Sequence, residues 1–288
     1  METSFLALQF LNAIQYSMLL FLLSIGLTVI FGLLHFVNLA HGALYAIGAY
    51  IGVSIAASTG SYWFAFFLAP LAVMAIGALL YFSLIERMRQ AGPMNQVLVT
   101  FGLIFVILDL IRLGWGDIAL GLEAPQLLTG ATQLASITYP TYRFFIIAVG
   151  AVVMVTLWGV FSRTQVGAMI RAGVENSDMA AALGINVGRL FFLVFCVGCA
   201  LAGLGGVVAA PVFSATTDMG ISILIPTLIV VVIGGLGSLA GAIVGSLLVG
   251  FIETFGAVVF PEVAAILSYV MLAAILILRP QGLIPARG

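Results

Sequence analysis

Long apolar stretches alternate with short polar connections along almost the whole chain. A helix needs about 20 apolar residues to cross a bilayer, and most of the stretches approach that length. The segment 223–236 is shorter than the rest, so the pattern predicts either eight or nine transmembrane helices. The stretches lie near residues 10–34, 42–58, 63–85, 96–115, 142–161, 190–210, 223–236, 239–258 and 263–279.

The pattern predicts an all-α polytopic integral membrane protein, with one transmembrane domain over residues 1–288. Composition supports this, because 64% of the residues are hydrophobic and 7% are charged, against about 25% charged residues in soluble domains. A soluble fold could not cover so much apolar surface. The N-terminus has no basic segment before Leu6, so we expect the first apolar stretch to remain as a transmembrane helix.

All nine basic residues are Arg, and the chain contains no Lys. A P-loop requires its Lys, so this chain cannot hold that kind of ATP site, and Schiff-base catalysis is excluded for the same reason. We therefore expect a non-catalytic chain that binds no cofactor or metal, with any ATP and Mg held by partner subunits. The net charge of −1 and the lack of a basic patch give no indication of nucleic-acid binding.

The positions of the Arg residues predict the orientation, because Lys and Arg concentrate in cytoplasmic loops. If there are nine spans, the N-terminus is outside and the C-terminus inside. The opposite loops carry Asp117, Glu123, Asp218 and Glu262, with Arg143 as an exception. Seven Arg fall on the predicted cytoplasmic side: Arg87, Arg89, Arg163, Arg171, Arg189, Arg279 and Arg287.

Two segments with polar or small residues interrupt the apolar pattern, and they predict broken or half helices near 35–42 and 234–241. Non-helical backbone at membrane depth is tolerated only where protein or a water-filled path satisfies its polar groups. Glycines four residues apart let two helices approach closely. The glycines expected to act as hinges or packing positions are Gly42, Gly48, Gly52, Gly234, Gly235, Gly237 and Gly241.

Four polar residues in or beside these breaks are candidates for a translocation path: Asn38, His41, Tyr45 and Ser238. A polar side chain at this depth is costly unless it is paired or hydrated. The alternative for Asn38 is a helix cap, and for His41 a packed, hydrogen-bonded side chain. For Ser238 the structural role is favoured over the path.

Residues 162–189 form the longest predicted cytoplasmic loop, and residues 115–141 form a loop on the outer side. Within the first, the sequence predicts a short helix at 177–183, capped by Ser177 or Asn176 and ended by Gly184 in a left-handed turn. An exposed helix with a small apolar face is typical of a docking element. The alternative is a solvated connector. The candidate residues for docking, and so for coupling to a partner subunit, are Arg171, Glu175, Ala181, Ala182 and Gly184.

Five segments, in order from near the N-terminus to the end, resemble the branched-chain amino acid ABC transporter permease family, in particular the first of its paired permeases. They are Asn38–Tyr50, Arg171–Ala172 with Ala181–Val187, Leu201–Gly206, Val231–Ser238 and Arg279–Leu283. The resemblance implies a multi-pass protein of the bacterial inner membrane. It also implies a complex with a second permease, two ATP-binding subunits and a periplasmic solute-binding protein. Ala181, Ala182 and Gly184 match the family's coupling motif.

One departure from the family leaves the cargo open. The family often has a carboxylate just after the Asn-Leu-Ala-His-Gly run, and here that position is Ala43. The resemblance implies branched-chain or other hydrophobic amino acids, while related permeases handle urea, short amides or aromatic acids.

Other functions receive less support from the residues. A secondary transporter would rely on Asp109 and Glu253, although Asp109 and Arg112 are spaced to pair with each other. An intramembrane serine hydrolase would need Ser238 close to His35 or His41. Cys196 and Cys199 have a CxxC spacing but lie inside an apolar stretch, so we expect two packed thiols.

Overall fold

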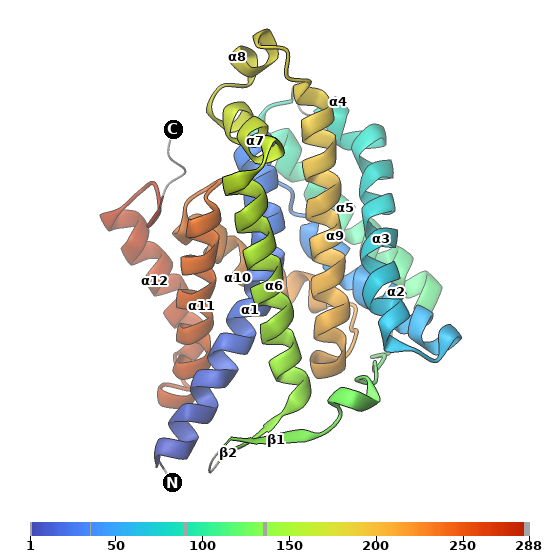
Figure 1. The fold of residues 1–288 in the computed structure, drawn as a ribbon, viewed down its shortest axis with the longest axis vertical. Helices are drawn as coiled ribbons and strands as arrows, with labels where there is room; N and C mark the ends of the chain where they lie inside the picture. Colours follow the sequence, from blue (N-terminus) through green and yellow to red (C-terminus); the bar gives the residue numbers. More distant parts are fainter. Residues whose placement is uncertain (1, 35, 89–90, 135–136, 285–288) are drawn as a thin grey trace.

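A computed structural model describes residues 2–34, 36–88, 91–134 and 137–284, and it is a bundle of helices (Figure 1). His35, Arg89 and Arg287 lie outside the described residues. The α-helices are α1 (Glu2–Leu34), α2 (His41–Thr59), α3 (Tyr62–Leu80), α4 (Glu86–Met88), α5 (Pro93–Trp115), α6 (Thr141–Arg163), α7 (Gln165–Glu175), α8 (Ser177–Ala182), α9 (Val187–Phe213), α10 (Met219–Gly234), α11 (Leu239–Val259) and α12 (Ala264–Leu278). A π-helical turn, η1 (Tyr81–Ile85), joins α3 to α4.

The predicted all-α polytopic membrane fold is confirmed. Among the described residues, seven helices are long and apolar enough to cross a membrane, and α10 and α12 are shorter apolar helices. Large apolar side chains cover the outside of the bundle, as on α5, where Phe101, Phe105 and Leu113 are exposed. Such a surface is stable in lipid and not in water.

The two ends of the bundle differ in charge. Helices α7 and α8 and the C-terminal end of the described chain lie at one end of the molecule, and the N-terminus lies at the other (Figure 1). The first end also carries Arg163, at the end of α6, and Arg189, in the first turn of α9. By the positive-inside rule this is the end expected on the cytoplasmic side. Termini at opposite ends are what nine crossings would give.

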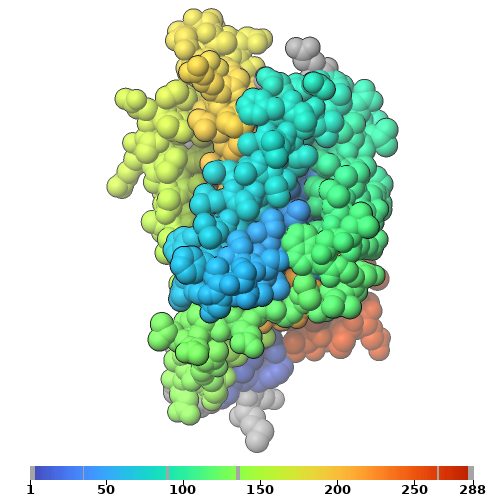
Figure 2. Space-filling model, turned by 90° about the vertical axis from the view of Figure 1, so that its right-hand side faces the viewer, coloured from blue at the N-terminus to red at the C-terminus, as the bar shows by residue number. Residues whose placement is uncertain are grey.

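The outer loop contains more structure than the sequence indicated. It holds a 3₁₀ turn, η2 (Gln126–Leu128), and an antiparallel hairpin of β1 (Ala131–Leu134) and β2 (Ile137–Pro140), in which Thr132 pairs with Tyr139. Figure 2 shows α2 in blue at the surface beside α3 and α5, with this loop in green beneath it. The hairpin lies at the outer end, beside the start of α6 (Figure 1).

The core is built around α1 and α9. Helix α1 packs on α6, α9, α10 and α11, and α9 packs on α2 and α3. Small residues allow the close contacts: a Cβ added to Gly48 of α2 would lie 2.5 Å from the Cα of Gly203 on α9. One turn further along α2, a Cβ on Gly52 would lie 2.7 Å from a methyl group of Val207. Backbones approach this closely only where side chains are absent.

Candidate translocation path and docking site

The first break lies between Leu34 at the end of α1 and His41 at the start of α2. Asn38 does not cap α2, contrary to one of the roles expected for it. The N-cap is Ala40, with no side-chain cap hydrogen bond. Both polar atoms of the Asn38 amide are buried without a hydrogen-bond partner among the described residues. Burying an amide unpaired is costly, so Asn38 opposes stable packing in the break.

His41 is fully buried and connects the start of α2 to the middle of α1. Its Nε2 lies 3.1 Å from the carbonyl oxygen of Leu23. A carbonyl can only accept, so Nε2 carries the hydrogen. The other ring nitrogen, Nδ1, is buried and has no partner among the described residues. The ring also lies close to Gly26, where a Cβ would come 3.0 Å from its Cε1 atom.

Helix α2 begins where α10 begins, and the two N-terminal turns cross backbone against backbone. A Cβ on Gly220 would lie 2.7 Å from the carbonyl oxygen of Gly42 and 3.3 Å from the Cα of Ala43. Neither helix has a side-chain cap. Ala43 is therefore buried at this crossing, and a carboxylate in its place would have little room.

Tyr45 lies one turn further along α2 and is also buried. Its ring packs next to Gly205 of α9, and its backbone carbonyl lies against Gly206. Asn38, His41 and Tyr45 therefore lie together inside the chain, and none of them reaches its surface.

The second break runs from Gly235 to Ser238, between α10 and α11. Gly235 and Gly237 have φ values of 105° and 79°, a region that favours glycine. Ser238 caps α11, because its Oγ accepts a hydrogen bond from the backbone N–H of Gly241 at 3.0 Å. Gly234 and Gly241 pack directly against each other and close the turn.

The last turn of α1 brings the second break and the cytoplasmic helices together. A Cβ on Gly32 would lie 2.5 Å from the Cα of Gly237 in the second break. The adjacent Leu33 touches α7, where a Cβ on Gly173 would lie 2.9 Å from a Leu33 methyl group. Both contacts come immediately before the first break. Movement of α7 would therefore displace Leu33 and Gly32, which lie next to the first break and, through Gly32, against the second.

The predicted cytoplasmic loop is largely helical. Its second helix, α8, matches the prediction: the Asn176 side chain accepts from the N–H of Met179 at 2.9 Å, and Gly184 has a φ of 88°. Helix α7 was not predicted, although Thr164 caps it and its apolar residues recur at helical spacing. Met179 and Leu183 are 59% and 75% exposed, which leaves an apolar surface at the end of the molecule. The candidate coupling residues Arg171, Glu175, Ala181, Ala182 and Gly184 are all exposed there.

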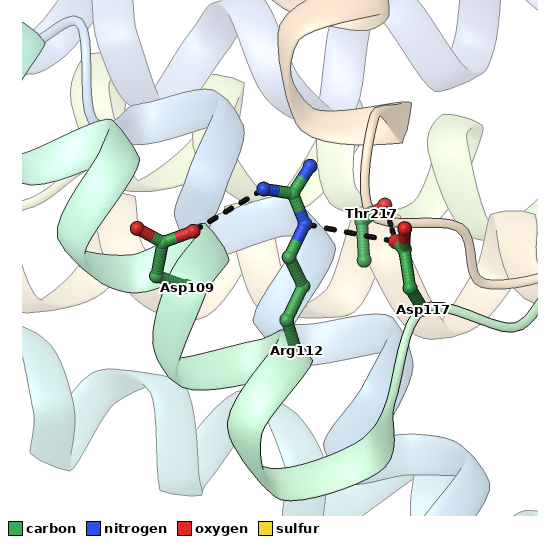
Figure 3. Close-up of polar contacts among 4 residues, drawn as sticks. All are labelled: Asp109, Arg112, Asp117 and Thr217. Carbon is green, nitrogen blue, oxygen red and sulfur yellow. Dashed lines mark hydrogen bonds and ion pairs between the residues drawn. The ribbon is translucent and has the colours of Figure 1, made fainter.

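The outer end of α5 carries a cluster of charges (Figure 3). The predicted pair is confirmed, since Arg112 lies 3.2 Å from Asp109. Arg112 also lies 3.6 Å from Asp117, which accepts a hydrogen bond from the Thr217 hydroxyl at 2.8 Å. This cluster links the end of α5 to the connection between α9 and α10. All three charged side chains are at least half exposed, so we assign the pairs a structural role.

The partly buried carboxylate of α11 has structural partners. The Glu253 carboxylate accepts hydrogen bonds from the hydroxyls of Tyr16 at 3.1 Å and Ser268 at 3.2 Å, and so joins α11 to α1 and α12. Cys196 and Cys199 are free, buried thiols. Within the described ranges no group of His, Cys, Asp or Glu could hold a metal ion. Those residues also show no pairing of Ser238 with His41, since each bonds to the backbone.

The seven long apolar helices of the described chain, with α2 and α10 starting at a mutual crossing inside the bundle, define a multi-pass membrane protein of the transporter class. The chain matches the family described as "Branched-chain amino acid transport system / permease component" over residues 9–278. It therefore belongs to this family, whose members are the non-catalytic permease components of transport systems.

The chain is also similar to individual members along nearly its whole length. It is 27% identical to the high-affinity branched-chain amino acid transport system permease protein LivH of Salmonella typhimurium, covering 96% of this chain and 94% of the relative. It is 27% identical to BraD of Pseudomonas aeruginosa, with the same coverage. A shorter match, 32% over 103 residues, is to the autoinducer 2 import system permease protein LsrD of Salmonella typhi. No solved structure matches the chain significantly.

Proposed function

We propose that this chain is one of two membrane-spanning subunits of an ATP-driven importer of the bacterial inner membrane. A second permease subunit forms the other half of the path, and two ATP-binding subunits hydrolyse ATP with Mg. A periplasmic solute-binding protein delivers the cargo to the outer end. The chain itself performs no bond chemistry, which agrees with its lack of the Lys that a P-loop needs.

The observation that supports this proposal best is the surface formed by α7 and α8. Met179 and Leu183 are exposed there beyond the bundle, where they gain nothing from lipid or from their own fold. An exposed apolar surface of this kind is typical of a protein contact. Through Gly173 and Leu33, α7 also touches α1 directly before the first break. Docking of an ATPase at α8 could therefore move the helices that form the path.

The cargo that we propose is branched-chain or other hydrophobic amino acids, as in LivH and BraD. The family match supports this cargo, whereas an importer of urea, short amides or aromatic acids is the alternative. The ligand carried by the partner binding protein decides between them. Binding of leucine, isoleucine or valine to that protein would support the first assignment, and exclusive binding of urea or an amide would refute it.

Asn38 and His41 are proposed to act in the path because their buried polar atoms lack partners in the break. Asn38→Leu removes the unpaired amide while keeping the approximate volume. If Asn38 acts in the path, uptake falls in this variant. The protein should stay as stable as wild type, because the two methyl groups of Leu replace two polar amide atoms that have no hydrogen-bond partner among the described residues. Unchanged uptake and unchanged cargo preference would assign Asn38 to packing alone.

The docking surface is tested with Ala182→Arg, because Ala182 is exposed on α8 and a charge there opposes apolar contact. We expect the two permeases to remain assembled while the ATP-binding subunits are lost on co-purification and uptake stops. Ala131→Arg, on the exposed outer hairpin, is the matched control and retains the ATP-binding subunits. Uptake that continues without the ATP-binding subunits would refute the importer and favour a secondary transporter.

A further inference from the structure

A groove of about 520 Å³ lies at the cytoplasmic end of the bundle, beside α7. Four parts of the chain form its walls: the last turns of α6, one face of α7, the second break with the first residues of α11, and Ile284 at the end of the described chain. Most of the wall is apolar. The residues that matter for its chemistry are Trp158, Phe161, Ser162, Arg171, Ser238 and Leu239.

The lining of the groove indicates a position near the lipid headgroups. Trp158 is in the second-last turn of α6, which ends at Arg163 and enters the Arg-rich end of the molecule. The Trp158 side chain is 52% exposed. Tryptophan concentrates at membrane interfaces because its ring is apolar while its N–H needs a polar partner. A groove lined by this side chain is therefore open at the boundary between acyl chains and cytoplasm.

The groove carries positive charge at one end. Arg171 is its only charged lining residue among the described residues, and no carboxylate lines the wall. The described part of the chain shows no ion pair to Arg171. The hydroxyls of Ser162 and Ser238 add polar groups at the same groove, while Trp158, Phe161 and Leu239 keep the rest apolar. An anionic group attached to a hydrocarbon chain would complement both parts.

We propose that this groove binds an anionic phospholipid of the cytoplasmic leaflet. The phosphate contacts Arg171, and an acyl chain lies along Trp158 and Phe161. Basic pockets between helices at the cytoplasmic side of a membrane bind such headgroups. A free phosphate ion shares the charge but would lose hydration against the apolar walls without compensation.

A lipid in this position would touch α7 and the second break at the same time, because Arg171 belongs to α7 and Ser238 to the break. This assignment differs from the coupling role expected for Arg171. It makes Arg171 a lipid contact on the side of α7 that faces the bundle, and leaves α8 as the ATPase contact. The lipid site stands independently of the proposed importer function.

Fluorescence quenching of Trp158 tests the site in the purified full-length chain. The probes are phosphatidylglycerol and phosphatidylcholine with brominated acyl chains in mixed micelles, and Trp158→Phe identifies the Trp158 signal. We expect half-maximal quenching at about fivefold less phosphatidylglycerol than phosphatidylcholine, the factor that one basic group near an anionic surface gives. Arg171→Gln removes this preference, while Arg171→Lys keeps it. Arg189→Gln is the matched control, an exposed Arg at the same end but outside the groove, and it retains the preference.

Equal quenching by the two lipids in wild type, or a preference that survives in Arg171→Gln, would overturn the proposal. If inorganic phosphate relieves quenching by phosphatidylglycerol, the site selects a phosphate ion and the lipid assignment fails. Native mass spectrometry gives an independent measurement, in which wild type retains phosphatidylglycerol and Arg171→Gln does not. Co-purification of the ATP-binding subunits with Arg171→Gln shows that the variant is folded, and their loss would return Arg171 to ATPase coupling.

Discussion

The crossing of α2 and α10 predicts a large effect for the smallest possible substitution, Gly220→Ala. The added Cβ would lie 2.7 Å from the Gly42 carbonyl oxygen, whereas ordinary contact begins at 3.4 Å, so the two backbones must separate by about 0.7 Å. The atoms in the way are backbone, and no side-chain rotation relieves the overlap. Overpacking of this kind costs roughly 1–3 kcal/mol.

Gly102→Ala is the matched control for this prediction. Gly102 is in the exposed interior of α5, where a Cβ meets nothing within 4 Å. Replacing a glycine inside a helix with alanine there should stabilise the protein by roughly 0.5–1 kcal/mol. Both variants add one methyl group to a helix, at a crowded position in one case and an open position in the other, so their stabilities should change in opposite directions from wild type.

Two measurements check this prediction, one on detergent-solubilised protein and one on reconstituted vesicles. Equilibrium unfolding by increasing mole fraction of SDS gives the free energy of unfolding, and uptake in reconstituted vesicles reports function. We expect Gly220→Ala to be the less stable variant and to transport more slowly than its remaining folded fraction accounts for. If Gly220→Ala were as stable as Gly102→Ala, the backbones of α2 and α10 would have room for the added Cβ, and the predicted overlap with Gly42 would be refuted.

Three further substitutions test individual contacts. Ser238→Ala removes the cap of α11 and should lower the free energy of unfolding by about 1 kcal/mol, with Ser238→Thr as the control that keeps the cap. In Glu253→Gln, the hydroxyl of Tyr16 or Ser268 would face an N–H donor in place of a carboxylate oxygen, and the protein should lose about 1–3 kcal/mol of stability. Combining it with Tyr16→Phe should remove this loss. Arg112→Ala should change stability by at most about 1 kcal/mol, and less at high salt, because the pairs are exposed; a larger, salt-independent loss would show a buried network.

The spans were predictable because a membrane-crossing helix requires a long run of apolar residues, and such a run can be read directly from the sequence. The predicted span 239–258 corresponds to Leu239–Val259, and both breaks lie where polar and glycine residues indicated them. The cap by Asn176 and the turn at Gly184 were also readable, since these depend on neighbouring residues. Helix α7 was missed because its polar residues resemble a loop, although the period of its apolar residues could have revealed it.

The site was less predictable than the fold. Residues distant in sequence decide it: Gly220 meets Gly42, Gly32 meets Gly237, and nothing local in the chain specifies either pairing. One role expected for Asn38 was to cap a helix. Ala40 is instead the N-cap of α2, so the Asn38 amide makes no cap hydrogen bond. Residue type predicted which positions are candidates for the site. Which of them are buried, and which polar atoms have no partner, depends on the three-dimensional structure.

The last described residues return to the end of α10, and this has a consequence for biosynthesis. The backbone N–H groups of Leu283 and Ile284 donate to the carbonyls of Ile233 and Gly234, at 2.8 and 3.1 Å. Gly282 packs against Gly235 beside them. These carbonyls remain without these donors until α11 and α12 have been synthesised and inserted. A ribosome stalled within α12 would therefore leave these two carbonyls at the end of α10 without their donors.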